Sequence, residues 1–258
     1  SKFMKIAVLV KQVPGSESSL PINSDQNWID EDQVSFVMNP PDNYAIEEAL
    51  LIKEKLGLGE VVIISKGPDR VQKIIREGLA KGADRGIHLL EEGPNSDPLS
   101  SAKSFSKIMK SENFDLILSG LQSDDLGLSQ TGVLIGEMLG YSTATLVVET
   151  VIEGNSLKVK RELESGWFQW VSFPFPASIS IQSGLNSPRY PSLKGIMSAK
   201  RKEIRIISEN EHSDSSKQQH IEKISLPTAN KKTEIIEGDS EEAIDRIVKI
   251  LKSEVKVL

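Results

Sequence analysis

A polar, glycine-containing segment at residues 119–132 has the composition and the position of an anion-binding loop. It follows the apolar run 116–118 and precedes the apolar-periodic segment 133–139, so it joins a buried strand to a helix. At such a junction, unpaired N–H groups and the helix dipole both favour a negative charge. We therefore predict that this loop binds the phosphate of a nucleotide.

The sequence argues against other kinds of site. There is no cysteine, which excludes disulfide bonds, iron–sulfur ligation and a thiol nucleophile. The histidines, His88, His212 and His220, are scattered and lack the spacing of zinc ligands. Asp124 and Asp125 are adjacent carboxylates on a loop, which face solvent more often than they bind metal or transfer protons. We expect neither a metal site nor a catalytic residue.

Length and composition are those of an ordinary globular protein. The 258 residues, 38% hydrophobic and 26% charged, can bury a full core. The net charge of -6 argues against nucleic-acid binding, which favours a basic face. No apolar run approaches the roughly 20 residues that span a bilayer, and residues 6–10 are too few for a secretory segment. We expect a cytoplasmic protein, or one of the mitochondrial matrix if the source is eukaryotic.

The elements that must position the loop are apolar strands alternating with amphipathic helices. Strands are predicted at 5–10, 60–65, 86–90, 115–119 and 144–148. Helices are predicted at 41–56, 71–80, 98–111 and 129–139, and residues 14–36 form a hairpin-like excursion. This alternation predicts an α/β fold with a mostly parallel, doubly wound sheet and helices on both faces.

The pattern changes after residue 150. Residues 151–159, with Glu-Gly-Asn at their centre, predict an added antiparallel β-hairpin region, and a further strand is predicted at 177–182. Residues 209–220 predict a solvated linker. A last helix at 239–252 carries one apolar stripe, which packs on its own domain or on a second chain. The predicted organisation is a nucleotide-binding α/β domain at 1–208, an extended linker or arm at 209–238 and a C-terminal helix at 239–258.

Five segments in register resemble one known family. They are Met38-Asn39-Pro40, Ser65-Lys66-Gly67-Pro68, Asp84-Arg85-Gly86-Ile87-His88, the loop from Gly120 to Gly132, and Leu185-Asn186-Ser187-Pro188-Arg189-Tyr190-Pro191-Ser192-Leu193. Together they closely resemble the β subunit of electron-transfer flavoprotein, from about Met4 to Ile204. The resemblance implies an adenine-nucleotide α-hydrolase-like fold.

The resemblance also implies cofactors and partners. Members are αβ heterodimers with one redox-active FAD, held mainly by the α subunit, and most hold a structural AMP in the β subunit. They accept electrons from flavoprotein dehydrogenases and pass them to a downstream acceptor. In bifurcating members a second FAD replaces the AMP. The C-terminal segment reaches the α subunit, which would give the predicted helix at 239–252 its partner.

The resemblance places the nucleotide site on four parts of the chain. The residues are Leu9; Asn39, Pro40, Pro41 and Asp42; Lys66; and Gly120, Leu121, Gln122, Ser123, Asp124, Asp125, Leu126, Gly127, Leu128, Ser129, Gln130 and Thr131. The N–H groups of Ser129, Gln130 and Thr131 would donate to the phosphate. Gly120 would let the backbone approach the ligand closely.

Three of these residues have alternative roles. Asn39 offers its amide to the adenine or ribose, or caps the helix that follows. Lys66 reaches a phosphate or is an ordinary solvated lysine. Ser129 contributes to the phosphate shell, caps its helix, or does both.

Departures from the family pattern bear on which nucleotide is bound. Bifurcating members typically carry Val-Gly-Pro after the glutamine of the loop, whereas this chain has Thr131-Gly132-Val133. That difference favours AMP over a second FAD. A stress-protein-like nucleotide-binding module is a further alternative.

A proline-rich segment is the candidate docking site for the dehydrogenase. Leu193, on a rigid loop, is a suitable anchor for a partner's pocket, and Arg189, Tyr190 and Ile196 are expected to contribute. The alternative is that Leu193 fills a local core.

Overall fold

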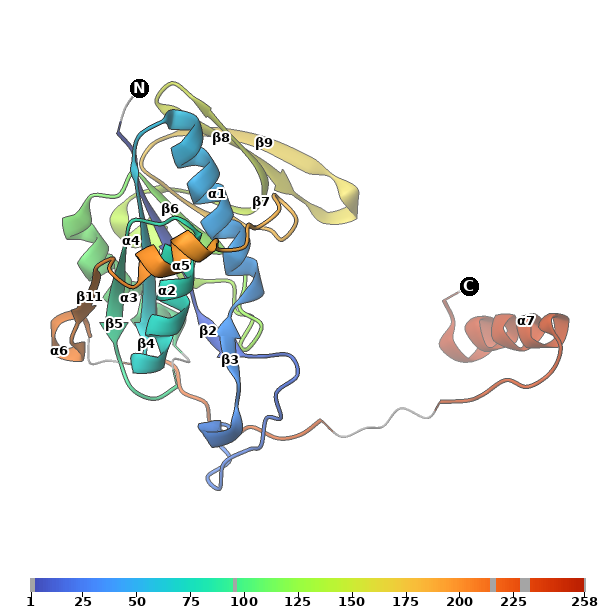
Figure 1. Ribbon diagram of the computed structural model, residues 1–258. Coiled ribbons are helices and arrows are strands. Elements are labelled where there is room, and N and C mark those ends of the chain that lie inside the picture. Colours follow the sequence, from blue (N-terminus) through green and yellow to red (C-terminus); the bar gives the residue numbers. More distant parts are fainter. Residues whose placement is uncertain (1–2, 95–96, 214–216, 228–232, 258) are drawn as a thin grey trace. The chain divides into compact units, whose positions relative to one another are not determined.

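The computed structural model describes residues 3–94, 97–213, 217–227 and 233–257 (Figure 1). The chain forms two units, residues 1–224 and residues 225–258. The predicted arm at 209–238 therefore spans their boundary, and residues 214–216 and 228–232 of it lie outside the described residues.

A nine-stranded sheet forms the centre of the first unit, in the order β11-β5-β4-β1-β6-β10-β7-β8-β9. Neighbours from β11 to β7 run parallel, and β7, β8 and β9 pair antiparallel. The strands are β1 (Lys5–Leu9), β4 (Glu60–Gly67), β5 (Arg85–Leu90), β6 (Leu116–Gly120), β7 (Ser142–Glu153), β8 (Ser156–Glu162), β9 (Phe168–Pro174), β10 (Ala177–Ile181) and β11 (Ile204–Ile207). The predicted α/β class and the added hairpin region are confirmed.

The central strands are apolar on both faces because helices cover both. In β1, Ile6 and Val8 belong to one hydrophobic core and Ala7 to the other, and all three are buried. Such continuous apolar runs are typical of parallel strands in covered sheets.

The helices of the first unit form two layers. Side chains of α1 and α2, with α5 beside α2, belong to the core on one face, and those of α3 and α4 to the core on the other. The helices are α1 (Pro40–Leu56), α2 (Gln72–Lys81), α3 (Pro98–Glu112), α4 (Thr131–Leu139), α5 (Leu193–Ala199) and α6 (Glu209–His212).

The excursion between β1 and α1 is a small hairpin. Strands β2 (Gln12–Pro14) and β3 (Phe36–Met38) pair antiparallel, with Gln12 opposite Met38. This pairing returns the chain to the carboxyl end of β1, so Asn39 and α1 begin beside the strand that precedes the excursion. There the N–H of Asn39 donates to the carbonyl of Lys11 at 2.8 Å.

The first residues of the predicted linker at 209–220 are folded. Glu209–His212 form α6, which begins with a capping box between Ser208 and Glu211. His212 is buried, and its Nε2 lies 2.9 Å from the carbonyl oxygen of Leu90. Burial of a single histidine leaves no periodic pattern, so composition alone indicated a solvated segment here.

The second unit contains α7 (Ser240–Lys249), followed by a π-helical turn at Ile250–Val255. Asp239 caps α7, since its side chain accepts from the N–H groups of Glu241 and Glu242. Within its own unit, the apolar stripe of α7 is open: Ile244 and Ile247 are 58% and 45% exposed. None of the helices among the described residues has the length and apolar character to cross a membrane.

Candidate functional site

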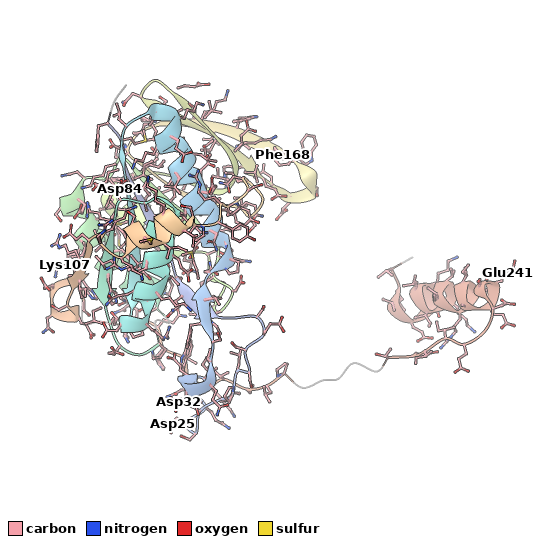
Figure 2. All side chains as sticks on the ribbon, viewed as in Figure 1. Asp25, Asp32, Asp84, Lys107, Phe168 and Glu241 are labelled. Atoms are coloured by element: carbon pink, nitrogen blue, oxygen red, sulfur yellow. The ribbon has the colours of Figure 1, made fainter. Side chains whose placement is uncertain are left out.

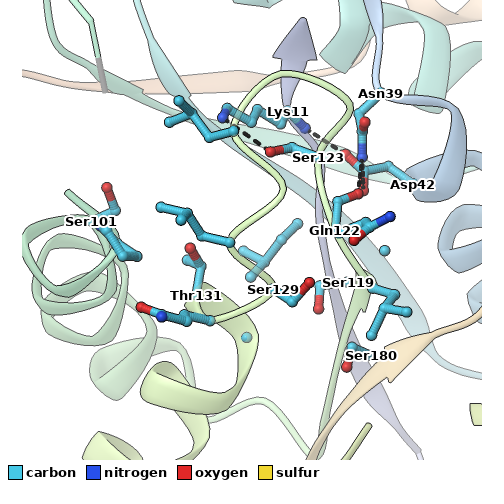
Figure 3. Close-up of a pocket in the computed structure, with 18 of the residues that line it drawn as sticks. Lys11, Asn39, Asp42, Ser101, Ser119, Gln122, Ser123, Ser129, Thr131 and Ser180 are labelled. Carbon is cyan, nitrogen blue, oxygen red and sulfur yellow. Dashed lines mark hydrogen bonds between the residues drawn. The ribbon is translucent and has the colours of Figure 1, made fainter. Parts of the chain in front are cut away.

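A cleft lies at the carboxyl ends of neighbouring parallel strands, where open α/β sheets bind their ligands (Figure 3). Lys66 at the end of β4, Leu9 at the end of β1 and Gly120 at the end of β6 all line it. The first turn of α4 and part of α3 close it from the other side. With Ser180 of β10 and Asp42 of α1, four strands and three helices therefore contribute to one cavity.

Most of the predicted nucleotide residues line this cleft. They are Leu9, Asn39, Asp42, Lys66, Gly120, Leu121, Gln122, Ser123, Leu126, Leu128, Ser129, Gln130 and Thr131. The others, Pro40, Pro41, Asp124, Asp125 and Gly127, do not line it.

Sequence reasoning did not name the remaining lining residues as ligand contacts. They are Val10, Lys11, Pro98, Ser101, Phe105, Ser119, Gly132, Val133 and Ser180. Val10 and Lys11 directly follow β1, and Ser119 and Gly132 bound the loop, so their positions offered a signal. The residues from α3 are brought to the cleft by tertiary packing and offered none.

Asn39 fastens the β6–α4 loop to the start of α1. Its buried Nδ2 donates to the carbonyl of Gln122 at 2.9 Å and to Asp42 Oδ1 at 3.1 Å. Its Oδ1 accepts from the N–H of Asp124 at 3.0 Å. The side chain makes no capping bond to α1, so the helix-cap alternative is wrong.

Asp42 is a buried carboxylate that meets the ends of two strands. Its Oδ2 accepts from the N–H of Lys11 at 2.7 Å, and the N–H of Gly120 also donates to it. Burial raises the pKa of Asp42 to about 7, although these hydrogen bonds oppose the shift.

A Cβ on Gly120 would collide with Asp42 Oδ1 and lie 2.9 Å from the Cβ of Pro41. Residue 120 must therefore be glycine for α1 to approach β6 this closely.

Lys11 holds the far side of the same loop. Its Nζ lies 2.7 Å from Asp125 Oδ1 and 3.3 Å from Ser123 Oγ. Burial would raise the pKa of Asp125, but the Lys11 ammonium outweighs it and holds that pKa below its usual range. Asp125 is thus an ionised anchor of the loop.

Lys66 is a buried cation in the wall of the cleft. Its side chain is 1% exposed, so the solvated-lysine alternative is wrong. Nζ lies 2.8 Å from Glu91 Oε2, but among the described residues it has no partner with hydrogen-bond geometry. Next to it, burial lowers the pKa of His212, and the Lys66 charge lowers it further. A buried ammonium with unused donors is a site for an anionic ligand.

The amino end of α4 also faces the cleft. Gln130 occupies the N-cap position without a capping side-chain bond, and Ser129 precedes it with φ 55°, so Ser129 does not cap the helix. A Cβ on Gly132 would lie 2.5 Å from Ser119 Oγ, which shows how closely α4 meets the end of β6. The positive end of the helix dipole and Lys66 therefore line the same cleft.

The chemistry of the lining suits an anionic ligand that also carries an apolar ring. Lys11, Lys66 and the α4 terminus favour an anion, and the side chains of Leu9, Phe105 and Leu128 offer apolar contact to a ring. No cluster of metal-ligating side chains occurs among the described residues.

The candidate docking segment is anchored by one residue and exposed at others. Tyr190 and Leu193 are 94% and 83% exposed, so Leu193 does not fill a local core; Ile196 and Met197 of α5 are exposed beside them. Arg189, predicted to contact a partner, binds Glu47 and Glu54 of α1 within this chain. Its guanidinium anchors the proline-rich segment to α1. The exposed apolar side chains are those of Tyr190, Leu193, Ile196 and Met197.

Comparison with known proteins gives a consistent result. Residues 26–212 match the family model described as Electron transfer flavoprotein domain. The electron transfer flavoprotein subunit beta of Methylophilus methylotrophus is 33% identical over 96% of this chain and 98% of its own length. The subunit beta proteins of Bradyrhizobium diazoefficiens and Homo sapiens are 40% and 36% identical, over 78% and 79% of this chain and 80% and 81% of theirs.

Proposed function

The chain belongs to the electron transfer flavoprotein family as a β subunit, and we propose that its cleft binds one structural AMP. In this proposal the phosphate lies at the start of α4 within reach of Lys66, and the β6–α4 loop surrounds the ribose. The chain contributes no catalytic residue. Family membership removes the stress-protein-like alternative.

One observation carries the nucleotide proposal: two independent positive features line the same cleft. Lys66 has a buried ammonium that forms an ion pair with Glu91 but, among the described residues, no contact of hydrogen-bond geometry, and α4 begins without a capping side chain. Glu91 balances the charge of this ammonium, but burying its remaining N–H donors without acceptors is costly. A phosphate placed between the two features would satisfy both.

The partners follow from the same membership. We infer that an α subunit holds the redox-active FAD and receives the open apolar stripe of α7, where Ile244 and Ile247 are exposed. We further propose that a flavoprotein dehydrogenase docks on Tyr190, Leu193 and the exposed face of α5. Large apolar side chains that stand open on an ordered segment are suited to a partner's pocket.

Titration of the full chain with AMP, followed by calorimetry, tests the nucleotide site. We expect the change Lys66→Gln to weaken AMP binding about tenfold to a hundredfold, since a hydrogen bond to a charged group contributes about 1.5–3 kcal/mol. The double variant Lys66→Gln, Glu91→Gln removes the ammonium without leaving a buried carboxylate unpaired. Lys107→Gln, on the exposed face of α3, is the matched control (Figure 2).

The outcomes separate the alternatives. Tight AMP binding by the unaltered chain and by the Lys107 variant, with weak binding by both Lys66 variants, supports the proposal. Equal AMP affinity in all variants contradicts the role of Lys66. Binding of FAD in preference to AMP would identify the cleft as the second flavin site of a bifurcating member.

A further inference from the structure

We propose that Asn39 and Asp42 are positioning residues: together they form a buried clamp that holds the β6–α4 loop in the shape that receives the nucleotide. The inference rests on the proposed nucleotide site and adds that these side chains act through the loop. Their polar groups are already occupied by protein partners, so their contribution does not require contact with the ligand.

The clamp joins segments that are far apart in the sequence. Asp42 accepts from the backbone N–H groups of Lys11, after β1, and of Gly120, at the end of β6. Asn39 holds Gln122 and Asp124 of the loop, which are 83 and 85 residues away in the chain. The bond from Asn39 Nδ2 to Asp42 Oδ1 at 3.1 Å links the two halves (Figure 3). The first turn of α1 thus fixes three walls of the cleft relative to one another.

Burial makes this clamp decisive for the loop. Asn39 and Asp42 are 1% and 4% exposed, so water cannot easily replace a lost partner. Beyond the clamp, the start of the loop is fixed by the bond from Leu121 N–H to the carbonyl of Ile181, and its middle by the surface ion pair of Lys11 with Asp125. Ser123 is held by Lys11 Nζ at its Oγ and by the N–H of Gly127 at its carbonyl, but none of these contacts binds the carbonyl of Gln122 or the N–H of Asp124, which Asn39 holds.

The clamp has a preferred ionisation state. Three donors converge on Asp42, namely the N–H groups of Lys11 and Gly120 and the amide of Asn39. An ionised carboxylate accepts all three hydrogen bonds. Protonation would turn one of its oxygens into an O–H donor that faces other donors. The charged groups around it are the Lys11 ammonium and, paired with that ammonium, Asp125. Because burial raises the pKa of Asp42 to about 7, the clamp changes state in the neutral range.

Calorimetric titration of the full chain with AMP between pH 5.5 and 8.5 tests the clamp. At pH 8 we expect Asp42→Asn to bind AMP about tenfold or more weakly, because an amide cannot accept all three donors. The unaltered chain should lose affinity as the pH falls through about 7, the pKa of Asp42. The variant should keep only the titration of the AMP phosphate itself. Asp25→Asn removes the same charge at an exposed position. This variant should bind AMP with the affinity and pH profile of the unaltered chain (Figure 2).

A second variant and a second readout cover the case in which Asp42→Asn does not fold. Asn39→Ala releases Gln122 and Asp124 but leaves the bond between Asp42 and Lys11. It should weaken AMP binding and speed amide hydrogen exchange at residues 121–125, with exchange in β1 and β4 unchanged.

Each result has one reading. Weak binding by both clamp variants, with the pH response near 7 lost in Asp42→Asn, supports the proposal. If the clamp variants bind AMP with the affinity and pH profile of the unaltered chain, the clamp is overturned and the nucleotide site stands. If the unaltered chain does not bind AMP at any pH, the nucleotide proposal fails, and the positioning role fails with it.

Discussion

Replacement of Arg189 by methionine should destabilise the first unit by about 2 kcal/mol. The guanidinium reaches Glu47 through Nε at 2.9 Å and Nη2 at 2.9 Å, and the Arg189 N–H adds a third bond at 2.9 Å. It also reaches Glu54 at 2.5 Å and 3.1 Å. Methionine keeps the aliphatic volume of the side chain and removes all the guanidinium bonds.

The magnitude follows from the exposure of the two carboxylates. The side chain of Glu47 is 6% exposed, so losing Arg189 leaves a nearly buried charge without its partner. Breaking a fully buried pair in this way costs about 3–5 kcal/mol, and the 32% exposure of Arg189 reduces that cost. Glu54 is 54% exposed, so its pair contributes only about 0–1 kcal/mol. The expected order of destabilisation is Arg189→Met, then Glu54→Gln.

Urea unfolding at pH 7, monitored by tryptophan fluorescence, measures this difference. All the tryptophans, Trp28, Trp167 and Trp170, lie in residues 1–224, so the signal reports the first unit. The double variant Glu47→Gln, Arg189→Met should be more stable than Arg189→Met alone, because it removes the unpaired charge.

Burial would raise the pKa of Glu47, but the bonds from Arg189 outweigh it and lower that pKa. The pair therefore contributes to the free energy of unfolding above pH 4.5, and this contribution is lost as the pH falls through the lowered pKa of Glu47.

Two results would refute this reasoning. One is a destabilisation by Arg189→Met no larger than that of Glu54→Gln. The other is a double variant whose loss of stability equals the sum of the losses for Glu47→Gln and Arg189→Met, since additivity would mean that the two side chains do not interact.

Three further changes have definite expected outcomes. Leu193→Ala should slow reduction by the dehydrogenase about tenfold or more, as for the loss of an interface anchor, with unchanged AMP binding; equal rates would exclude Leu193 as an anchor. For Asp42, whose pKa rises from 3.8 to about 7 on folding, the free energy of unfolding should fall by about 4 kcal/mol between pH 4 and pH 8 relative to Asp42→Asn; parallel stability curves would contradict the shift. Asp97→Ala removes the cap that accepts from Leu99 and Ser100 of α3 and should cost about 1 kcal/mol in urea unfolding; no loss of stability would contradict the capping role.

Much of the fold could be predicted from the sequence because its elements carry periodic apolar patterns. The strands at 5–9, 60–67 and 116–120 contain the continuous apolar runs 6–9, 61–64 and 116–118, which is what a sheet covered on both faces requires. The hairpin at the β7–β8 turn was marked by Gly154, which has φ 60°. Local chemistry alone was sufficient at these places.

The site could be predicted only in part. The loop residues were indicated because a strand, a polar glycine-containing segment and a helix follow one another in the chain. Phe105 reaches the cleft only through packing of α3, and such contacts leave no local signal. Arg189 was placed in the docking group because it belongs to the proline-rich segment around Leu193, but the direction of its side chain is set by two carboxylates more than 130 positions earlier in the chain.

We propose that this β subunit carries AMP rather than a second flavin. The most direct measurement is denaturation of the purified αβ heterodimer, followed by quantitation of the released FAD and AMP. We expect one FAD and one AMP for each heterodimer. Two FAD and no AMP would contradict it and would make the cleft beside Lys66 and α4 a flavin site.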